Sequence, residues 1–311
     1  MKKATECYRI VEQGILPSSF FCEETISEFL VNEKRKKVWA VEVDLLLQLD
    51  TVCRKHNLQY SLAVGSLLGV IRHHGFIPWD DDIDVFMPRA DYELLKKYKS
   101  EFNGPYFLQY PGNDNEYAFS FAKLRNCNTT GISWSFRYAS FNQGICIDIF
   151  PLDNYSSYRL NKNLEKISNL VAECSALMRR GNPYPDANDQ IKLCRFPVIR
   201  DVGTIVKELD CILRQHEHEI SDRYVVWSVL VYSIEKLTFD KALYDDLIET
   251  DFYGHSVFIP RRYDEVLTIS YGDYMKLPPV EERGKWHDKC VFDPDTPYKV
   301  SLQLLRNQDK L

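Results

Sequence analysis

The chain has 311 residues, 45% of them hydrophobic, and its 39 Lys and Arg residues stand against 45 Asp and Glu residues, a net charge of −6. This length and hydrophobic content suffice for one large domain, or two interlocked ones, with a real core. The acidic balance argues against a nucleic-acid binder, which usually carries a basic excess. Small or lipid-linked polar substrates stay open.

The cysteines and the apolar runs bear on the compartment. Nine cysteines are scattered without a C-x-x-C spacing, which indicates reduced thiols in a cytoplasm rather than a disulfide framework or a zinc site. The N-terminus lacks the apolar run of an export signal, and the longest apolar stretch, 224–234, is too short to span a bilayer. We therefore expect a cytoplasmic protein.

The first half of the chain alternates helix and strand signals. Apolar residues recur at spacings of three and four from Val38 to Val52, which predicts an amphipathic helix that Asn57 ends. In chain order, the next predicted elements are a strand over 59–64, a break at Gly65-Ser66, a helix over 67–73, a strand over 80–87, a helix from Pro88 to Phe102, and strands over 117–126 and 144–153.

The second half is predicted to be mainly helical from 155 to 250. Within it, 196–215 is a candidate amphipathic helix, which could contact a membrane surface or pack on its own domain. The segment 263–287 is rich in aromatic residues, prolines and charges, a mixture typical of loops that line a site.

The stretch GFIPWDDDIDVF, residues 75–86, places four aspartates among core-forming residues. If 80–87 is a strand, Asp80, Asp82 and Asp84 share one face, about 7 Å apart, and Asp81 faces away. We expect Asp81 to matter less and Asp80 to lie at the edge of the site. A row of carboxylates suits a hard cation such as Mg²⁺. A solvated acidic turn is the plain alternative.

A third carboxylate is predicted to join this row. Asp148 lies in the apolar strand ICIDIF, where an acid is a poor choice unless it meets Asp82 and Asp84 around the same metal ions. We therefore expect two Mg²⁺ ions, with Mn²⁺ as an alternative, at Asp82, Asp84 and Asp148.

Gly65 and Ser66 form a small-residue turn between a strand and a helix, where backbone N–H groups can hold a phosphate. Such a turn is often only a tight connection. Here a short helix separates it from the acids, the order needed to hold a phosphate chain over the metals.

An EF-hand calcium loop is a competing, non-catalytic interpretation of the acids. It requires a glycine at the sixth loop position and a glutamate at the twelfth, where this chain has Val85 and Asp91. The pattern does not fit.

The block VGSLLGVIRHHGFIPWDDDIDVFMPRADYELL resembles the defining block of the LicD family, phosphotransferases with a nucleotidyltransferase fold related to fukutin. FAKLRNCNTTGI, GICIDIFPLD and YGDYMKLPPVEERGKWH support it, so the resemblance covers roughly 35–155 and 255–290. The implied fold is α+β, a nucleotidyltransferase-like mixed sheet flanked by helices. The implied domains are a catalytic core over 1–154 and 251–311 and a helical insertion over 155–250 that recognises the acceptor.

The resemblance implies transfer of phosphocholine, or another phosphorylated alcohol, from a CDP-activated donor such as CDP-choline to a hydroxyl of a cell-surface glycan. Teichoic acid, capsule and lipopolysaccharide are the implied acceptors, at the inner face of the membrane where the glycan is lipid-linked. The family's G-[GS] turn carries over to Gly65 and Ser66, its D-x-D to Asp82 and Asp84, and its third carboxylate to Asp148. The fifteen residues between Ser66 and Asp82 exceed the spacing typical of the wider fold group.

Other residues are candidates for substrate contact. Arg72, Lys123 and Arg125 could contact phosphate, although each could equally be an ordinary surface charge. Trp286 and His287 could hold a trimethylammonium group, by cation–π attraction for the ring.

Three other function classes compete. A D-x-D glycosyltransferase would bind a nucleotide sugar with a single metal and no need of Asp148. A nucleotidyltransferase acting on nucleic acid would share all three acids but is disfavoured by the acidic balance. A non-catalytic nucleotide- or glycan-binding protein is disfavoured by the retained acids.

Overall fold

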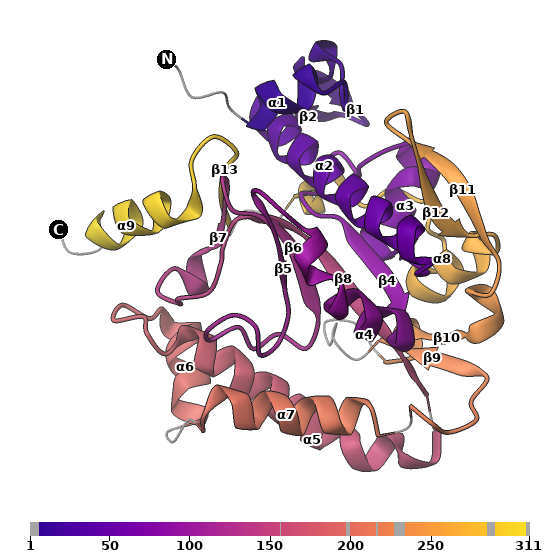
Figure 1. The fold of residues 1–311 in the computed structure, drawn as a ribbon, viewed down its shortest axis with the longest axis vertical. Coiled ribbons are helices and arrows are strands. Elements are labelled where there is room, and N and C mark those ends of the chain that lie inside the picture. Colours follow the sequence, from indigo (N-terminus) through magenta and orange to yellow (C-terminus); the bar gives the residue numbers. More distant parts are fainter. Residues whose placement is uncertain are drawn as a thin grey trace.

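The computed structural model describes residues 6–155, 157–196, 200–215, 217–226, 234–284 and 290–308, with the backbone alone for 157–162 and 189. Helices surround a central mixed sheet (Figure 1), which confirms the predicted α+β class. The α-helices within the described residues are α1 (Glu6–Glu12), α2 (Glu33–His56), α3 (Val64–His73), α4 (Arg89–Lys97), α5 (Ser157–Arg179), α6 (Ala187–Arg195), α7 (Val202–Leu213), α8 (Tyr263–Tyr271) and α9 (Tyr298–Gln308).

Seven strands build the central sheet. They are β3 (Ser61–Leu62), β4 (Asp84–Pro88), β5 (Tyr106–Gln109), β6 (Ala122–Asn126), β8 (Ile145–Asn154), β9 (Arg223–Val225) and β10 (Thr238–Asp240). Shorter pairs are β1 (Glu24–Ile26) with β2 (Phe29–Val31), β7 (Thr130–Ser133) with β13 (Cys290–Asp293), and β11 (Leu247–Phe252) with β12 (His255–Pro260).

Strand β8 holds the sheet together. It pairs in parallel with β4 on one side, and antiparallel with β6 and then β9 on the other. Ile145, Ile147 and Ile149 alternate along it and are fully buried, while Cys146 and Asp148 between them are only partly buried. The period of two therefore gives this strand one core face and one face that is open to a cavity.

Helix α2 forms as its sequence predicts. The Asn32 side chain accepts the Arg35 N–H at its start, and Asn57 ends it in a left-handed conformation with φ of 52°. Its apolar stripe packs against β6 and β8, so the helix crosses the sheet diagonally in Figure 1. At this position, residues of α2 can reach the acids at the sheet edge.

A bidentate ion pair ties α4 to the sheet. Arg89 Nε donates to Asp153 Oδ1 at 2.6 Å and Arg89 Nη2 to Asp153 Oδ2 at 2.8 Å, and both side chains are buried. Because α4 follows directly on β4, this pair fixes the strand that begins with Asp84.

The segment 155–250 has two parts. Helices α5, α6 and α7 fill the first, as predicted, and α5 and α7 lie side by side below the sheet in Figure 1. The second part differs from the prediction, because β9 and β10 extend the central sheet beside β8. Within the 196–215 stretch, residues 202–213 form α7, whose Ile205, Leu209 and Leu213 are buried in a second core with α5. Its apolar face is thus covered by its own domain.

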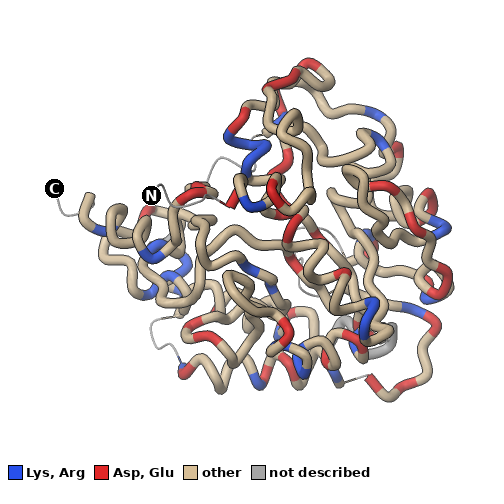
Figure 2. The backbone as a smooth tube through the Cα atoms, turned by 45° about the horizontal axis from the view of Figure 1, so that its top comes forward, with Lys and Arg blue, Asp and Glu red and all other residues tan. Residues whose placement is uncertain are grey.

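Charged residues occur on every part of the molecule. Figure 2 shows Lys and Arg positions interspersed with Asp and Glu positions along the described chain, so the basic residues are not gathered in one segment. Within the described residues, no helix has both the length and the hydropathy needed to cross a bilayer.

Candidate active site

Three strands bring two acids and a lysine into one row. Asp84 on β4 is the register partner of Asp148 on β8, and Asp148 is also the partner of Lys123 on β6. Register partners on neighbouring strands share a face of the sheet. Lys123 Nζ forms an ion pair with Asp148 Oδ1. The predicted proximity of Asp84 and Asp148 is therefore confirmed.

The stretch before β4 is not a strand, contrary to the prediction for 80–87. The Asp80 N–H donates to the Ile77 carbonyl at 2.9 Å in a turn, and Arg35 Nη1 and Trp39 Nε1 donate to the Asp80 carbonyl at 2.7 and 3.0 Å. These contacts bind the backbone at Asp80 to α2, and only at Ile83, whose carbonyl accepts the Asp148 N–H at 2.8 Å, does the stretch bond to β8. Extended pairing begins only at Asp84.

The facing of the acids agrees only in part with the prediction. Asp80, Asp82 and Asp84 line one cavity without Asp81, as alternation predicts, but Asp81 lines a second cavity together with Asp82 and so also reaches the site. Oxygens from Asp80, Asp81 and Asp82 lie within 4.8 Å of one another, a spacing that could hold a metal ion. Carboxylate oxygens are the ligands that Mg²⁺ prefers, so the donor set fits the expected cation.

The charge of these acids also fits a cation. Burial, together with the negative charges of Asp80 and Asp84, raises the pKa of Asp82 well above its usual value. A carboxyl group placed among like charges binds a proton or a cation more readily than an isolated one.

Gly65 and Ser66 lie inside the first turn of α3, because the helix begins at Val64 and not at 67 as predicted. A Cβ on Gly65 would lie 2.8 Å from Asp80 Oδ2, so only glycine allows this approach. The Ser66 hydroxyl accepts the Asp84 N–H at 2.8 Å. The two residues thus position acids of the row as well as the helix start.

Val64 has a φ of 44°, in the left-handed region that β-branched residues seldom adopt. Backbone strain of this kind is held in place by the surrounding structure and is frequent at functional sites. It turns the chain sharply from β3 into α3, next to the acids.

Two cavities lie on either side of the acids. The first, which we call the β6–β8 cavity, has a volume of about 250 Å³ and is lined by Glu42, Asp81, Asp82, Lys123, Arg125 and Asp148 together with Phe119, Phe136, Phe141 and Phe292. The second, the α3 cavity, has a volume of about 500 Å³ and is lined by Gly65, Arg72, Asp80, Asp82, Asp84, Tyr271, Tyr274 and Lys276 among others. Asp82 lines both.

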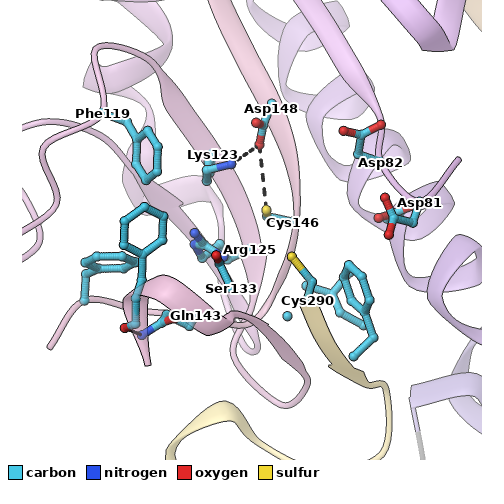
Figure 3. Close-up of a pocket in the computed structure, with 16 residues that line it drawn as sticks. Asp81, Asp82, Phe119, Lys123, Arg125, Ser133, Gln143, Cys146, Asp148 and Cys290 are labelled. Carbon is cyan, nitrogen blue, oxygen red and sulfur yellow. Dashed lines mark hydrogen bonds and ion pairs between the residues drawn. The ribbon is translucent and has the colours of Figure 1, made fainter. Parts of the chain in front are cut away.

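Figure 3 shows the β6–β8 cavity. Asp148 contacts Lys123 and lies 3.7 Å from Cys146 Sγ, while Asp81 and Asp82 stand on the opposite side from Phe119. Burial alone would lower the pKa of Lys123, but the charges of Asp148 and Cys146 and the hydrogen bond to Asp148 together raise it, which keeps the ammonium charged inside the cavity.

The predicted phosphate contacts are not surface charges. Arg72 lines the α3 cavity and donates to the Tyr274 carbonyl at 2.8 Å, so it also holds the 271–284 segment in place. Arg125 is buried and donates to Gln109 Oε1 and to the Gly144 carbonyl. Trp286 and His287 lie outside the described residues.

Glu42 is a site residue that the sequence analysis did not identify. It is 1% exposed on α2 and lines the β6–β8 cavity, and burial together with the charges of Asp81, Cys146, Asp80 and Asp148 raises its pKa well above the usual value. The missed signal is an acid on the apolar stripe, four residues after Val38.

The segment that carries the site matches a known protein family. Residues 57–169, which include α3, β4, β6 and β8, match the family LicD/FKTN/FKRP, nucleotidyltransferase domain. The chain is similar to the lipopolysaccharide cholinephosphotransferase LicD of Haemophilus influenzae, at 28% identity over 268 residues, 79% of this chain and 92% of that protein. An uncharacterised protein of Rickettsia prowazekii is 28% identical over 100 residues, 30% of this chain and 38% of its own length.

Proposed function

Because this chain belongs to the LicD family, we propose that it transfers phosphocholine, or a similar phosphorylated alcohol, from a CDP-activated donor to a hydroxyl of a cell-surface glycan. CMP is the other product. The similar protein of H. influenzae is named for lipopolysaccharide as acceptor. Teichoic acid and capsule are further acceptors included in the proposal.

The observation that carries this proposal is the position of Asp82 between two cavities. A group transfer needs two substrates that meet at one reaction centre. The α3 cavity, at about 500 Å³, is the larger and is within the usual range for small-molecule sites. We assign it to the CDP donor, and the β6–β8 cavity to the acceptor hydroxyl.

The donor assignment is supported by the residues of the α3 cavity. The first turn of α3 adjoins it, and a helix N-terminus favours phosphate. Arg72 and Lys276 add positive charge on the same cavity. Ser66 is buried beside the cavity, and its hydroxyl accepts the Asp84 N–H, which positions this acid at the cavity wall.

We propose that Asp82, Asp84 and Asp148 hold two Mg²⁺ ions, or Mn²⁺ in their place, with Asp80 and Asp81 adjoining the same centre. When bound there, the metal supplies positive charge for the donor diphosphate and the departing CMP. Asp148 accepts the proton of the acceptor hydroxyl, whose oxygen forms the new bond to the choline-bearing phosphorus. The bond from that phosphorus to the CMP oxygen breaks, and its electron pair leaves with CMP. Lys123 places an ammonium group beside this exchange.

The location follows from the same proposal. All nine cysteines are free, as expected in a reducing compartment. We propose that the protein works in the cytoplasm, at the inner face of the membrane where a lipid-linked glycan would be reached.

A donor panel tests the proposed reaction. The full chain is incubated with Mg²⁺, a glycan acceptor, and in turn CDP-choline, CDP-ribitol, CDP-glycerol and UDP-sugars, and nucleotide release is followed by ³¹P NMR. CMP release from CDP-choline, or from one of the other CDP-alcohols, is the expected result. Release of UDP from a UDP-sugar alone would favour a glycosyltransferase instead.

A further inference from the structure

A carboxyl oxygen of Glu42 is buried in the protein without a partner. Glu42 Oε2 has no hydrogen-bond partner within the described residues, and only 1% of the residue is exposed to solvent. Its neighbours on the same stripe of α2, Val38, Leu45 and Leu46, are apolar core residues. A buried polar atom with no partner costs free energy, and a charged group costs more than a neutral one. A hydrophobic residue here would avoid that cost.

The side chain lines the cavity that holds the reaction centre. Glu42 shares the β6–β8 cavity with Asp81, Asp82 and Asp148. Three residues earlier on α2, Trp39 donates to the Asp80 carbonyl at 3.0 Å. One rigid helix therefore fixes both Glu42 and the acidic loop, and holds them in a constant relation.

The cations of the cavity are engaged elsewhere. Lys123 is paired with Asp148, and Arg125 donates to Gln109 Oε1 and the Gly144 carbonyl. Within the described part of the chain, Glu42 Oε2 thus has no side-chain cation as its partner, while Asp81, Asp82 and Asp148 line the same cavity. The ligand chemistry that suits several converging carboxylates is a hard divalent cation.

We propose that Glu42 is a further carboxylate of the metal centre, bound to a divalent cation directly or through one water. The inference rests on the metal centre of the proposed function and extends it to α2, which lies outside the matched segment 57–169. Bound in this way, Glu42 gains the partner that it lacks and connects the core helix to the reacting groups.

Manganese binding to the full chain tests this inference without any substrate. Free Mn²⁺ is measured by electron paramagnetic resonance during titration of the wild type, Glu42→Gln, Asp82→Asn and Asp44→Asn. Glu42→Gln is expected to weaken binding by roughly 10–100-fold, the loss typical when a metal-supporting group is removed. Asp44→Asn is the matched control, because Asp44 is a buried acid on the same helix that pairs with Arg9 and Tyr106. Its binding is expected to stay within about two-fold of wild type.

Thermal unfolding with EDTA and with Mg²⁺ separates a metal role from a structural one. Glu42→Gln should unfold at or above the wild-type temperature in EDTA, and gain less from Mg²⁺. A protein destabilised equally in both buffers, with unchanged Mn²⁺ affinity, would overturn the inference. If Glu42→Gln does not fold, the Mn²⁺ titration is repeated with Glu42→Asp, which draws the carboxylate back by one methylene. Wild-type Mn²⁺ affinity in Glu42→Asp would also overturn the inference.

The two proposals fail differently. If Asp82→Asn loses Mn²⁺ and Glu42→Gln binds it as the wild type does, only the role of Glu42 is wrong. If the wild type binds no Mn²⁺, or Asp82→Asn binds it unchanged, the metal centre of the proposed function is wrong and the role of Glu42 with it.

Discussion

Lys123 and Asp148 are register partners on β6 and β8, and their side chains form an ion pair inside the cavity next to Asp84. In the absence of metal, Lys123 is the cation that neutralises Asp148. Lys123→Met should therefore destabilise the metal-free protein by about 2 kcal/mol, below the 3–5 kcal/mol of fully buried pairs because both side chains reach the cavity. Mg²⁺ should restore part of this loss.

Urea unfolding in EDTA and in Mg²⁺ measures both effects. Lys37→Met is the control, since Lys37 pairs with Glu33 on the surface of α2 and its loss should cost less than about 1 kcal/mol. Equal destabilisation of the Lys123 variant with and without Mg²⁺ would show that the lysine does not stand in for the metal.

Gly65→Ala tests the close approach of α3 to Asp80. The new Cβ would lie 2.8 Å from Asp80 Oδ2, so the carboxylate must move away from its neighbours. We expect a folded protein with Mn²⁺ affinity and CMP release each reduced about ten-fold, a loss of ~1.4 kcal/mol. Gly203→Ala, also at the second residue of a helix but with ordinary 3.5 Å contacts, should leave both unchanged. Full CMP release by Gly65→Ala would show that the close approach of α3 to Asp80 is not needed for activity.

Asp81→Asn should be as damaging as Asp82→Asn. The loop does not alternate like a strand, and Asp81 contributes to the oxygen cluster and to the β6–β8 cavity. Each variant is expected to lower CMP release at least about ten-fold. Asp91→Asn, on α4 away from the cavities, serves as the control. If Asp81→Asn lowers CMP release much less than Asp82→Asn does, Asp81 faces away from the reaction centre, as in a strand.

His73 gives the protein a pH-dependent stability near the site. Burial, with the positive charges of Arg72 and Arg283, lowers the pKa of His73 to about 4. Between about pH 6.5 and 4 the unfolded chain then binds the proton that the folded chain excludes, so stability falls as the pH falls. Because His73 is only half buried, solvent screening keeps its contribution below about 1.4 kcal/mol per pH unit. Above pH 6.5 its contribution is flat.

His73→Gln should flatten this part of the profile, because glutamine keeps an acceptor for the Arg72 Nε donor and does not titrate. Urea unfolding at several pH values between 7 and 5 provides the comparison. Parallel profiles for the two proteins would show that other groups cause the acid sensitivity.

Local signals predicted much of the fold. The spacing of apolar residues and Asn57 at the C-terminal end predicted α2, and the β-branched and aromatic content of 144–153 predicted β8. The proximity of Asp84 and Asp148 could be predicted because both residues lie in segments predicted to be strands. The family resemblance assigned both to one site.

The loop at 80–83 could not be predicted from its own residues. Its backbone follows Arg35 and Trp39, more than forty positions earlier, whose donors bind the Asp80 carbonyl. The same alternating pattern of acidic and apolar residues can occur in a loop and in a strand, so the pattern does not distinguish the two. Periodicity therefore grouped Asp80, Asp82 and Asp84 correctly along one cavity, but did not show that Asp81 and Asp82 share a second one.

Glu42 was missed for a related reason. An acid on an apolar stripe is a visible anomaly, but its meaning depends on which cavity the helix faces. Only the packing of α2 on the sheet shows that this cavity also holds Asp81, Asp82 and Asp148.

The central claim is that this chain moves phosphocholine with a metal held at Asp82. CDP-choline labelled in the choline methyl groups is incubated with the full chain, Mg²⁺ and lipopolysaccharide or teichoic acid, and the label on the recovered glycan is counted. We predict metal-dependent labelling of at least one glycan, abolished by EDTA and by Asp82→Asn but kept in Asp91→Asn. Labelling that is indifferent to EDTA and to Asp82→Asn, or CMP release with no label on any glycan, would contradict it.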